Sequence, residues 1–177
     1  MGWQQHYEQL SCGRFEGDLW QAVLRDGFFV REQTNRQLRE QIAPPPDHVV
    51  IALPQAVEPG SLYAGRPLDR DTLMVLSGGR EVDVLSAGEL DLIGLAVNRR
   101  LLEQALAPQC LEWLLHAEGE RNLGLLPEAA QAIRRMLHDT FGEVGRGLVD
   151  AGAAAADDGF GADLLQHALQ QAVTLAM

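Results

Sequence analysis

The chain has 177 residues, 46% hydrophobic and 22% charged, and its 25 carboxylates outnumber 14 basic side chains, all of them arginine. This length and apolar fraction predict one domain, or one with an appendage, and exclude a wholly disordered chain. No apolar run approaches the roughly 18 residues of a membrane-spanning helix. The first residues have neither the basic start nor the apolar core of a signal peptide. We therefore expect a cytoplasmic protein without a membrane partner.

The negative charge is spread over the whole chain. Residues 1–97 hold 8 arginines and 14 carboxylates, and residues 98–177 hold 6 arginines and 11 carboxylates. Since neither half is a basic module, we expect no specific DNA binding by these residues themselves. The two cysteines are far apart and outside any Cys-x-x-Cys pattern, so they are expected to be reduced thiols.

In chain order, the first half alternates short apolar stretches with turn residues, a pattern typical of strands. Asp26-Gly27 predicts a hairpin turn, and the three prolines at 44–46 predict a loop. Such a series of short strands is typical of a sandwich, a jelly roll or a barrel. The predicted strands cover roughly 6–11, 14–25, 28–34, 37–42, 48–53, 61–68, 72–77, 81–86 and 89–97.

From Asn98 onward, apolar residues recur at helical spacing. Asn98 is expected to cap a helix that stops at Pro108, a short apolar helix is predicted over 111–115, and Pro127 suits the first position of a third helix. Residues 142–162, rich in Gly and Ala, predict a frayed helix end and a linker.

The last predicted helix covers 162–177, and its apolar, uncapped end predicts that the protein continues into a further segment. Strands followed by helices indicate an α+β fold rather than alternating strands and helices. We expect a strand region over residues 1–97 and a helical region over residues 98–177.

Two apolar stripes on the predicted helices have 3.6-residue spacing. Part of this surface is expected to cover the strands, and the rest to meet the same helices of a second copy around a two-fold axis. The alternative is that all of it covers the strands of its own chain. The stripes consist of Ala129, Ile133, Met136, Leu137, Thr140, Phe141 and Val144, and of Leu165, Leu169 and Val173.

No catalytic constellation is found. The five histidines have no metal-site spacing, and none pairs with a nearby cysteine. There is no Gly-x-Ser-x-Gly, no phosphate-binding loop and no dinucleotide fingerprint. We expect no enzyme activity, no metal and no cofactor.

One hairpin, over 28–42, carries unusual chemistry. Period-2 alternation places Glu32 and Glu40 on the same, more apolar and inward face, with Arg31 and Arg39 on the other. Because an unpaired buried charge is costly, the carboxylates would lie at a rim or pair with an inward arginine, or else line a cavity for a polar or cationic ligand.

Several segments, in their order and spacing, resemble the start of AraC-type transcriptional regulators. Within this family, they are most similar to the regulators of ethanolamine-utilisation operons. The resemblance spans about residues 3–106. It is carried by Trp3–Leu10, Gly13–Gly17, Phe29–Thr34, Ile51–Pro54, Gly78–Asp83 and Leu92–Val97.

The resemblance implies a cupin-like β barrel (a jelly roll) that binds a small-molecule effector, followed by helices that form a homodimer. DNA would be bound only by a helix-turn-helix domain absent from this chain. The alternatives are an enzyme on a cupin scaffold, such as an isomerase or dioxygenase, and a purely structural dimerisation module.

If the effector resemblance also holds, the ligand is an ethanolamine-like amine. A buried ammonium needs a carboxylate partner, and aromatic faces add cation–π attraction. We expect Glu32 to be the charge partner, Trp20 and Phe28 to be the walls, and Glu40 to be a weaker second carboxylate.

Overall fold

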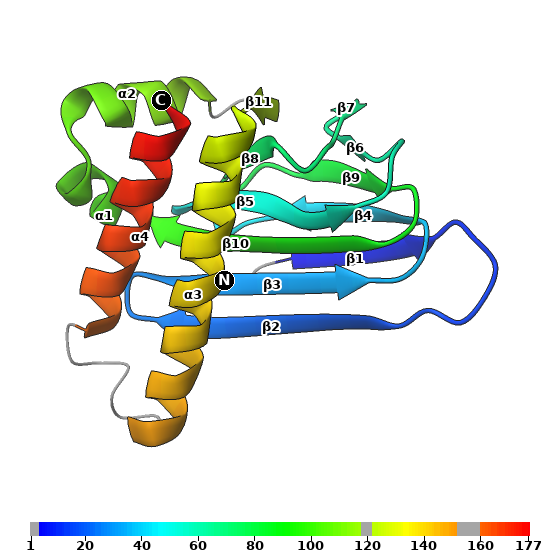
Figure 1. Ribbon diagram of the computed structural model, residues 1–177, viewed down its shortest axis with the longest axis horizontal. Coiled ribbons are helices and arrows are strands. Elements are labelled where there is room, and N and C mark those ends of the chain that lie inside the picture. The colour runs from blue at the N-terminus through cyan, green and yellow to red at the C-terminus, as the bar shows by residue number, and fades with distance from the viewer. Residues whose placement is uncertain (1–3, 118–121, 152–159) are drawn as a thin grey trace.

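The computed structural model describes residues 4–117, 122–151 and 160–177. Nearly all of the described strands precede the helices, with one short strand between the second and third helix, so the predicted α+β class is confirmed (Figure 1). All strand pairs are antiparallel, and they form two sheets. Among the described strands no ladder joins the two sheets, so the predicted closed barrel is not confirmed.

The smaller sheet has five strands in the order β1-β4-β9-β6-β7. The larger sheet has six strands in the order β11-β8-β5-β10-β3-β2. The strands of the first are β1 (Gln4–Gln9), β4 (Leu38–Ala43), β9 (Val82–Ser86), β6 (Leu62–Tyr63) and β7 (Arg66–Pro67). Those of the second are β11 (Asn122–Gly124), β8 (Thr72–Ser77), β5 (His48–Val57), β10 (Leu90–Asn98), β3 (Gly27–Thr34) and β2 (Gly17–Leu24).

The larger sheet is the middle layer of the molecule. Residues Leu90–Val97 of its central strand β10 are all buried, because one face of the sheet meets the smaller sheet and the other meets the helices. A strand buried on both faces reads as a nearly continuous apolar run. The sequence Leu-Ile-Gly-Leu-Ala-Val in this strand has that character.

Four helices follow β10: α1 (Arg99–Ala105), α2 (Pro108–Ala117), α3 (Pro127–Ala151) and α4 (Phe160–Ala176). Asn98 caps α1 as predicted, and its side chain accepts a hydrogen bond from the Arg100 amide at 2.8 Å. Pro108 does more than end this helix, because it is also the first residue of α2, a position that tolerates a missing N–H.

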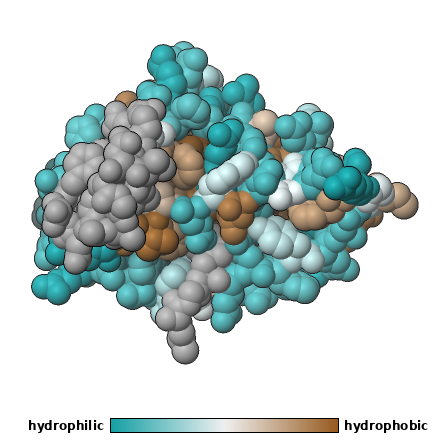
Figure 2. Space-filling view, turned by 90° about the horizontal axis from the view of Figure 1, so that it is seen from below, coloured by the Kyte–Doolittle hydropathy of each residue, from teal (hydrophilic) through white to brown (hydrophobic). Residues whose placement is uncertain are grey.

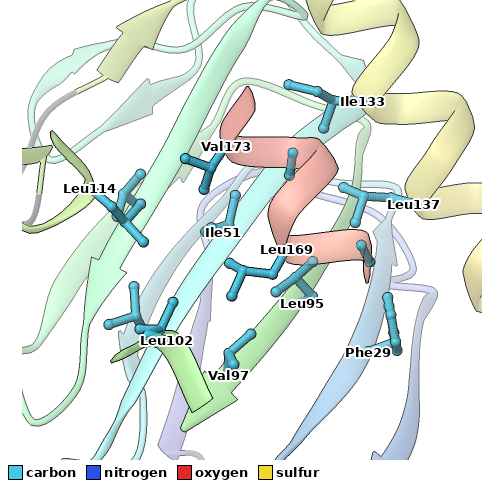
Figure 3. Packing of buried hydrophobic residues seen from close by; sticks show 14 of the residues in the cluster. Phe29, Ile51, Leu95, Val97, Leu102, Leu114, Ile133, Leu137, Leu169 and Val173 are labelled. Atoms are coloured by element: carbon cyan, nitrogen blue, oxygen red, sulfur yellow. The ribbon is translucent and has the colours of Figure 1, made fainter. Parts of the chain in front are cut away.

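The helices share one apolar core with the outer face of the larger sheet. Figure 3 shows Leu169 and Val173 of α4 between the strands and α3, with Ile51 and Leu95 beneath them. Full burial of side chains of this size stabilises the fold by about 1.5–3 kcal/mol each. Ile133, Leu137, Leu169 and Val173 are therefore interior residues of a single chain and form the part of the predicted stripes that covers the strands. Of the other predicted stripe positions, the side chains of Val144 and Leu165 lie outside the described residues.

Three further predictions are corrected. The strand expected over 61–68 is two short strands around a turn at Ala64-Gly65. The helix expected to fray from residue 142 continues to Ala151, and 152–159 lie outside the described residues. The strand β11, which pairs with β8, was not predicted.

The β2–β3 hairpin turns at Arg25-Asp26, one residue earlier than predicted, and Gly27 is already paired with Leu24. Gly27 is needed for another reason. A Cβ at this position would lie 2.1 Å from the Ala96 carbonyl oxygen of β10, closer than any real Cβ contact. The glycine thus allows the start of β3 to pack tightly against β10.

Strand β2 is the outer edge of the larger sheet. Figure 2 looks at the molecule from the side on which β2 lies and shows a mostly hydrophilic face with separate hydrophobic patches. Among the exposed large apolar side chains, Leu19, Trp20 and Val23 belong to this strand. Within the described residues, no helix is long and apolar enough to cross a membrane.

Candidate functional site

Glu32 and Glu40 lie in the gap between the two sheets, on the inward face that strand alternation predicted. Glu32 is on β3 in the larger sheet and is 5% exposed, and Glu40 is on β4 in the smaller sheet and is 2% exposed. Arg31 and Arg39 point away as predicted, and they bind Asp91 and Asp83, each at 2.8 Å. The period-2 pattern thus placed both carboxyls correctly.

Two side chains from β1 hold these carboxyls in place. Gln5 Nε2 donates to Glu32 Oε2 at 3.1 Å and to Glu40 Oε1 at 2.8 Å. Tyr7 Oη donates to Glu32 Oε1 at 2.9 Å. Among the described residues no arginine pairs with either carboxyl, so the predicted arginine pairing is wrong. The carboxyls are stabilised instead by Gln5 and Tyr7, two neutral hydrogen-bond donors on the edge strand β1.

Burial raises the pKa of both carboxyls. Burial and the charge of Glu32 raise the pKa of Glu40 well above its ordinary range. Burial also raises the pKa of Glu32, opposed by hydrogen bonds from Tyr7, Glu40 and Gln5 that favour its charged form. Glu40 is therefore the more readily protonated of the two, and the hydrogen bonds to Glu32 favour its charged form. Burial raises the pKa of the Tyr7 phenol far above its usual value, so it remains a hydrogen-bond donor.

Glu32 lies between two cavities. On one side is an enclosed apolar cavity of about 30 Å³, enough for a water-sized group only. On the other side is a more open pocket of about 130 Å³. The apolar cavity is also lined by Val30, Ile42, Val50, Ala52, Met74, Leu76, Leu92 and Gly94. The pocket is also lined by Tyr7, Phe15, Gly17, Asp18, Leu19, Gln33 and Thr34.

Two aromatic rings line the larger pocket. The rings of Tyr7 and Phe15 have centroids 6.5 Å apart and are tilted by 37°. Phe15 lies over Gly17, where a Cβ would come within 2.5 Å of the ring. A side chain at position 17 would therefore push this aromatic wall aside.

Thr34 also lines this pocket. It lies two residues after Glu32 on β3, and its residue is 5% exposed. Its Oγ1 is buried and has no hydrogen-bond partner among the described residues. An unpaired buried hydroxyl is costly, and in a pocket it is a natural partner for a polar ligand. The residues that line the pocket thus carry a carboxylate, an unpaired hydroxyl and two aromatic rings.

The predicted walls of the site are corrected. Trp20 pairs with Arg31 across the β2–β3 ladder. Residues directly opposite share a face, so Trp20 lies on the face away from Glu32 and is 43% exposed. Phe28 shares the face of Glu32 but lies four residues earlier on β3, and its ring contacts His48 at a centroid distance of 6.0 Å. Neither residue lines the pocket.

The two aromatic residues that line the pocket beside Glu32 are Tyr7 and Phe15. The sequence analysis missed them because they come from the first strand and the loop after it. The alternation of Gln5 and Tyr7 on β1 was the one available signal, since β1 pairs with β4 and sets Tyr7 opposite Glu40. Within the described residues, no group of three His, Cys, Asp or Glu side chains converges as a metal site would require.

Comparison of the chain with protein-family models, with curated proteins and with solved structures finds no match.

Proposed function

We propose that the chain is the effector-sensing and dimerisation part of an AraC-type transcriptional regulator, and that a small amine binds in the pocket beside Glu32. One observation carries the ligand class: Glu32 and Thr34, whose hydroxyl has no partner among the described residues, line one pocket together with two aromatic residues. The sequence resemblance supplies the regulator class, and this pocket is consistent with the amine that the resemblance implies.

Each feature of the pocket matches one part of an amino alcohol. An ammonium leaves water at a cost unless a carboxylate receives it, and hydrogen bonds favour the charged form of Glu32. Rings such as those of Tyr7 and Phe15 attract a cation by about 0.5–2 kcal/mol. The Thr34 hydroxyl, two residues along the same strand, can pair with the ligand hydroxyl. Ethanolamine has all three complementary groups.

The proposed fold is a cupin-like jelly roll whose two sheets enclose the site. Two antiparallel sheets packed face to face, with polar side chains gathered between them, support this assignment. Effector binding would act by linkage: the ligand favours one arrangement of the domain, and this changes how paired DNA-binding domains are held. The proposal places DNA recognition in a further domain outside these 177 residues, and the protein in the cytoplasm.

The dimer surface is proposed on the outer side of the helices. A groove of about 460 Å³ lies between α3 and α4, on the side that does not pack on the sheet. Its lining mixes apolar and amide side chains, as an interface between identical helices would require. The groove is lined by Ala132, Met136, His167, Gln170, Gln171, Thr174 and Leu175.

A second candidate is an enzyme on the same scaffold, favoured by one observation. Two buried carboxyls with raised pKa values can act as acid and base, as an isomerase requires. If so, Glu40→Gln would abolish turnover while leaving binding intact, whereas a sensor would show ligand binding with no chemical change of the ligand.

The test is calorimetric titration with ethanolamine, ethylamine, propionate and ethylene glycol. Four non-hydrogen atoms yield at most about 6 kcal/mol, so the expected Kd for ethanolamine is no tighter than about 40 μM. Glu32→Gln keeps the shape of the side chain and is expected to abolish binding. Glu8→Gln removes an exposed carboxylate from the neighbouring strand β1 and is the matched control. Binding of propionate alone, lost in Arg31→Ala and unchanged in Glu32→Gln, would overturn the proposal.

A further inference from the structure

A second polar pocket, of about 240 Å³, lies where α3 packs against β5 and the turn before β8. Four of its residues, Gln131, Arg134, Arg135 and His138, follow the spacing of one helix face. The remaining lining residues are Gln55, Arg70 and Asp139. Because α3 covers the outer face of the larger sheet, this pocket is separate from the carboxyl site between the sheets.

The pocket is a positive spot on a strongly negative chain. Its three arginines are set against Asp139 and Asp71, while the chain as a whole carries a charge of −11. Arg70 and Arg135 have no ion pair among the described residues. Asp139 has a strongly exposed side chain, and its partner is His138 at 3.6 Å. The two free guanidinium groups are therefore available to an anion.

Arg134 gives the pocket a fixed base. It is 9% exposed, donates to the Arg70 carbonyl oxygen and lies 3.3 Å from Asp71 Oδ1. These bonds tie α3 to the turn that carries Arg70. The segments that carry Arg70 and Arg135 are thus held together by a buried contact, while the side chains of these two arginines are exposed.

Gln55 adds a donor without an acceptor. Its Nε2 is buried and has no hydrogen-bond partner among the described residues. Buried N–H groups are almost always paired, so an acceptor brought into this pocket would relieve the cost of the unpaired amide. The lining thus has one amide donor and two guanidinium groups against a single carboxylate, Asp139, and this excess of donors is complementary to an oxyanion.

We propose that the pocket formed by Gln55, Arg70 and Arg135 binds a small oxyanion, the phosphate or carboxylate group of a metabolite. Guanidinium forks match the paired oxygens of both groups, and the Gln55 amide supplies the third donor at the base. Bound there, the anion bridges β5, the turn before β8 and α3. It therefore stabilises the attachment of the helical layer to the sheet, and it does so independently of any ligand at Glu32.

The experiment is titration of the whole chain with sodium phosphate and with sodium succinate, followed by calorimetry and thermal unfolding. Sodium chloride at the same ionic strength corrects for screening. Binding of phosphate alone identifies a phosphate-bearing ligand, binding of succinate alone identifies a carboxylate, and either supports the site. No heat and no rise in Tm beyond the chloride control at millimolar concentrations of both anions would overturn it.

Three variants locate the site. Arg135→Gln removes an exposed charge and is expected to weaken anion binding about tenfold, the effect of losing one charge-assisted hydrogen bond. Arg14→Gln makes the same change at a side chain that is 85% exposed and distant in sequence from the pocket residues. This variant should leave anion binding unchanged. Gln55→Met removes the unpaired donor at similar size, so it should weaken binding without lowering Tm in chloride. Equal losses in Arg135→Gln and Arg14→Gln would show a general charge effect and refute the pocket.

Discussion

Glu32 and Glu40 belong to different sheets, yet one amide group, Gln5 Nε2, donates to both carboxyls, at 3.1 and 2.8 Å. The two sheets are thus joined at this point by polar contacts rather than by a backbone ladder. A charged ligand at Glu32 therefore changes the pKa of both carboxyls.

Amine affinity should rise with pH. The pKa of each carboxyl is raised in the ligand-free protein, and a bound ammonium favours the charged forms and lowers both. Protons and ammonium therefore compete, so the Kd for ethanolamine should fall as the pH increases through the raised pKa values and level off above them. Titrations in buffers of different ionisation enthalpy should show proton release on binding. Affinity that increases toward acid pH would contradict this account.

Glu40→Gln should stabilise the protein at alkaline pH. The pKa of Glu40 is higher in the folded than in the unfolded chain, so its stabilising contribution is complete below the ordinary carboxyl range and is lost as pH rises through the folded value. At pH 5 the amide mimics the protonated acid, and little change is expected. At pH 8 the free energy of unfolding should increase by about 1–3 kcal/mol, the usual cost of an underpaired buried group. Urea unfolding at both pH values measures this, and Glu8→Gln, at an exposed position, should show no such difference.

Thr34→Val should separate stability from ligand recognition. Valine has nearly the same shape and removes a buried hydroxyl that has no partner among the described residues, so the unliganded protein should gain up to about 1 kcal/mol. The same change should remove the preference for ethanolamine over ethylamine, while Thr34→Ser keeps it. Thermal unfolding and paired titrations with the two amines test both expectations. A variant that loses stability and still prefers ethanolamine would show that the hydroxyl has no role in the pocket.

Leu175→Glu should weaken the proposed dimer without unfolding the chain. Leu175 lines the groove between α3 and α4 and is 38% exposed, so a charge there is tolerated in a monomer but not at an interface between copies. Sedimentation velocity at micromolar concentrations should show a dimer for the original chain and a monomer for the variant. Leu126→Glu, at a side chain 74% exposed and outside the groove, is the control. A monomeric original chain would refute the interface.

Local patterns predicted the strands and the inward face of the hairpin, because both follow from side-chain alternation within one segment. The walls of the pocket depend on pairings between distant segments. Trp20 is adjacent to β3 in the sheet, and its register sets it opposite Arg31. The predicted turn at Asp26-Gly27 would have set it opposite Gln33, on the same outward face, so the hairpin sequence already excluded Trp20 as a wall. Tyr7 and Phe15 lie beside Glu32 only because β1 pairs with β4 in the smaller sheet, which faces the larger sheet that carries Glu32. Likewise, apolar periodicity identified the buried face of α3 but not whether its own sheet or a second copy would cover it.

The ion pair between Arg31 and Asp91 has a consequence for how the chain reaches this structure. Arg31 donates to both oxygens of Asp91, at 3.1 and 2.8 Å, and Gln33 donates to the same carboxylate at 2.6 Å. Asp91 is 7% exposed, so any slip of β3 against β10 would strand a charge in the interior. A slip by one residue would also turn Glu32 toward the helices. The Arg31–Asp91 ion pair, on the far face of β3, thus helps to fix the register that turns Glu32 toward the pocket.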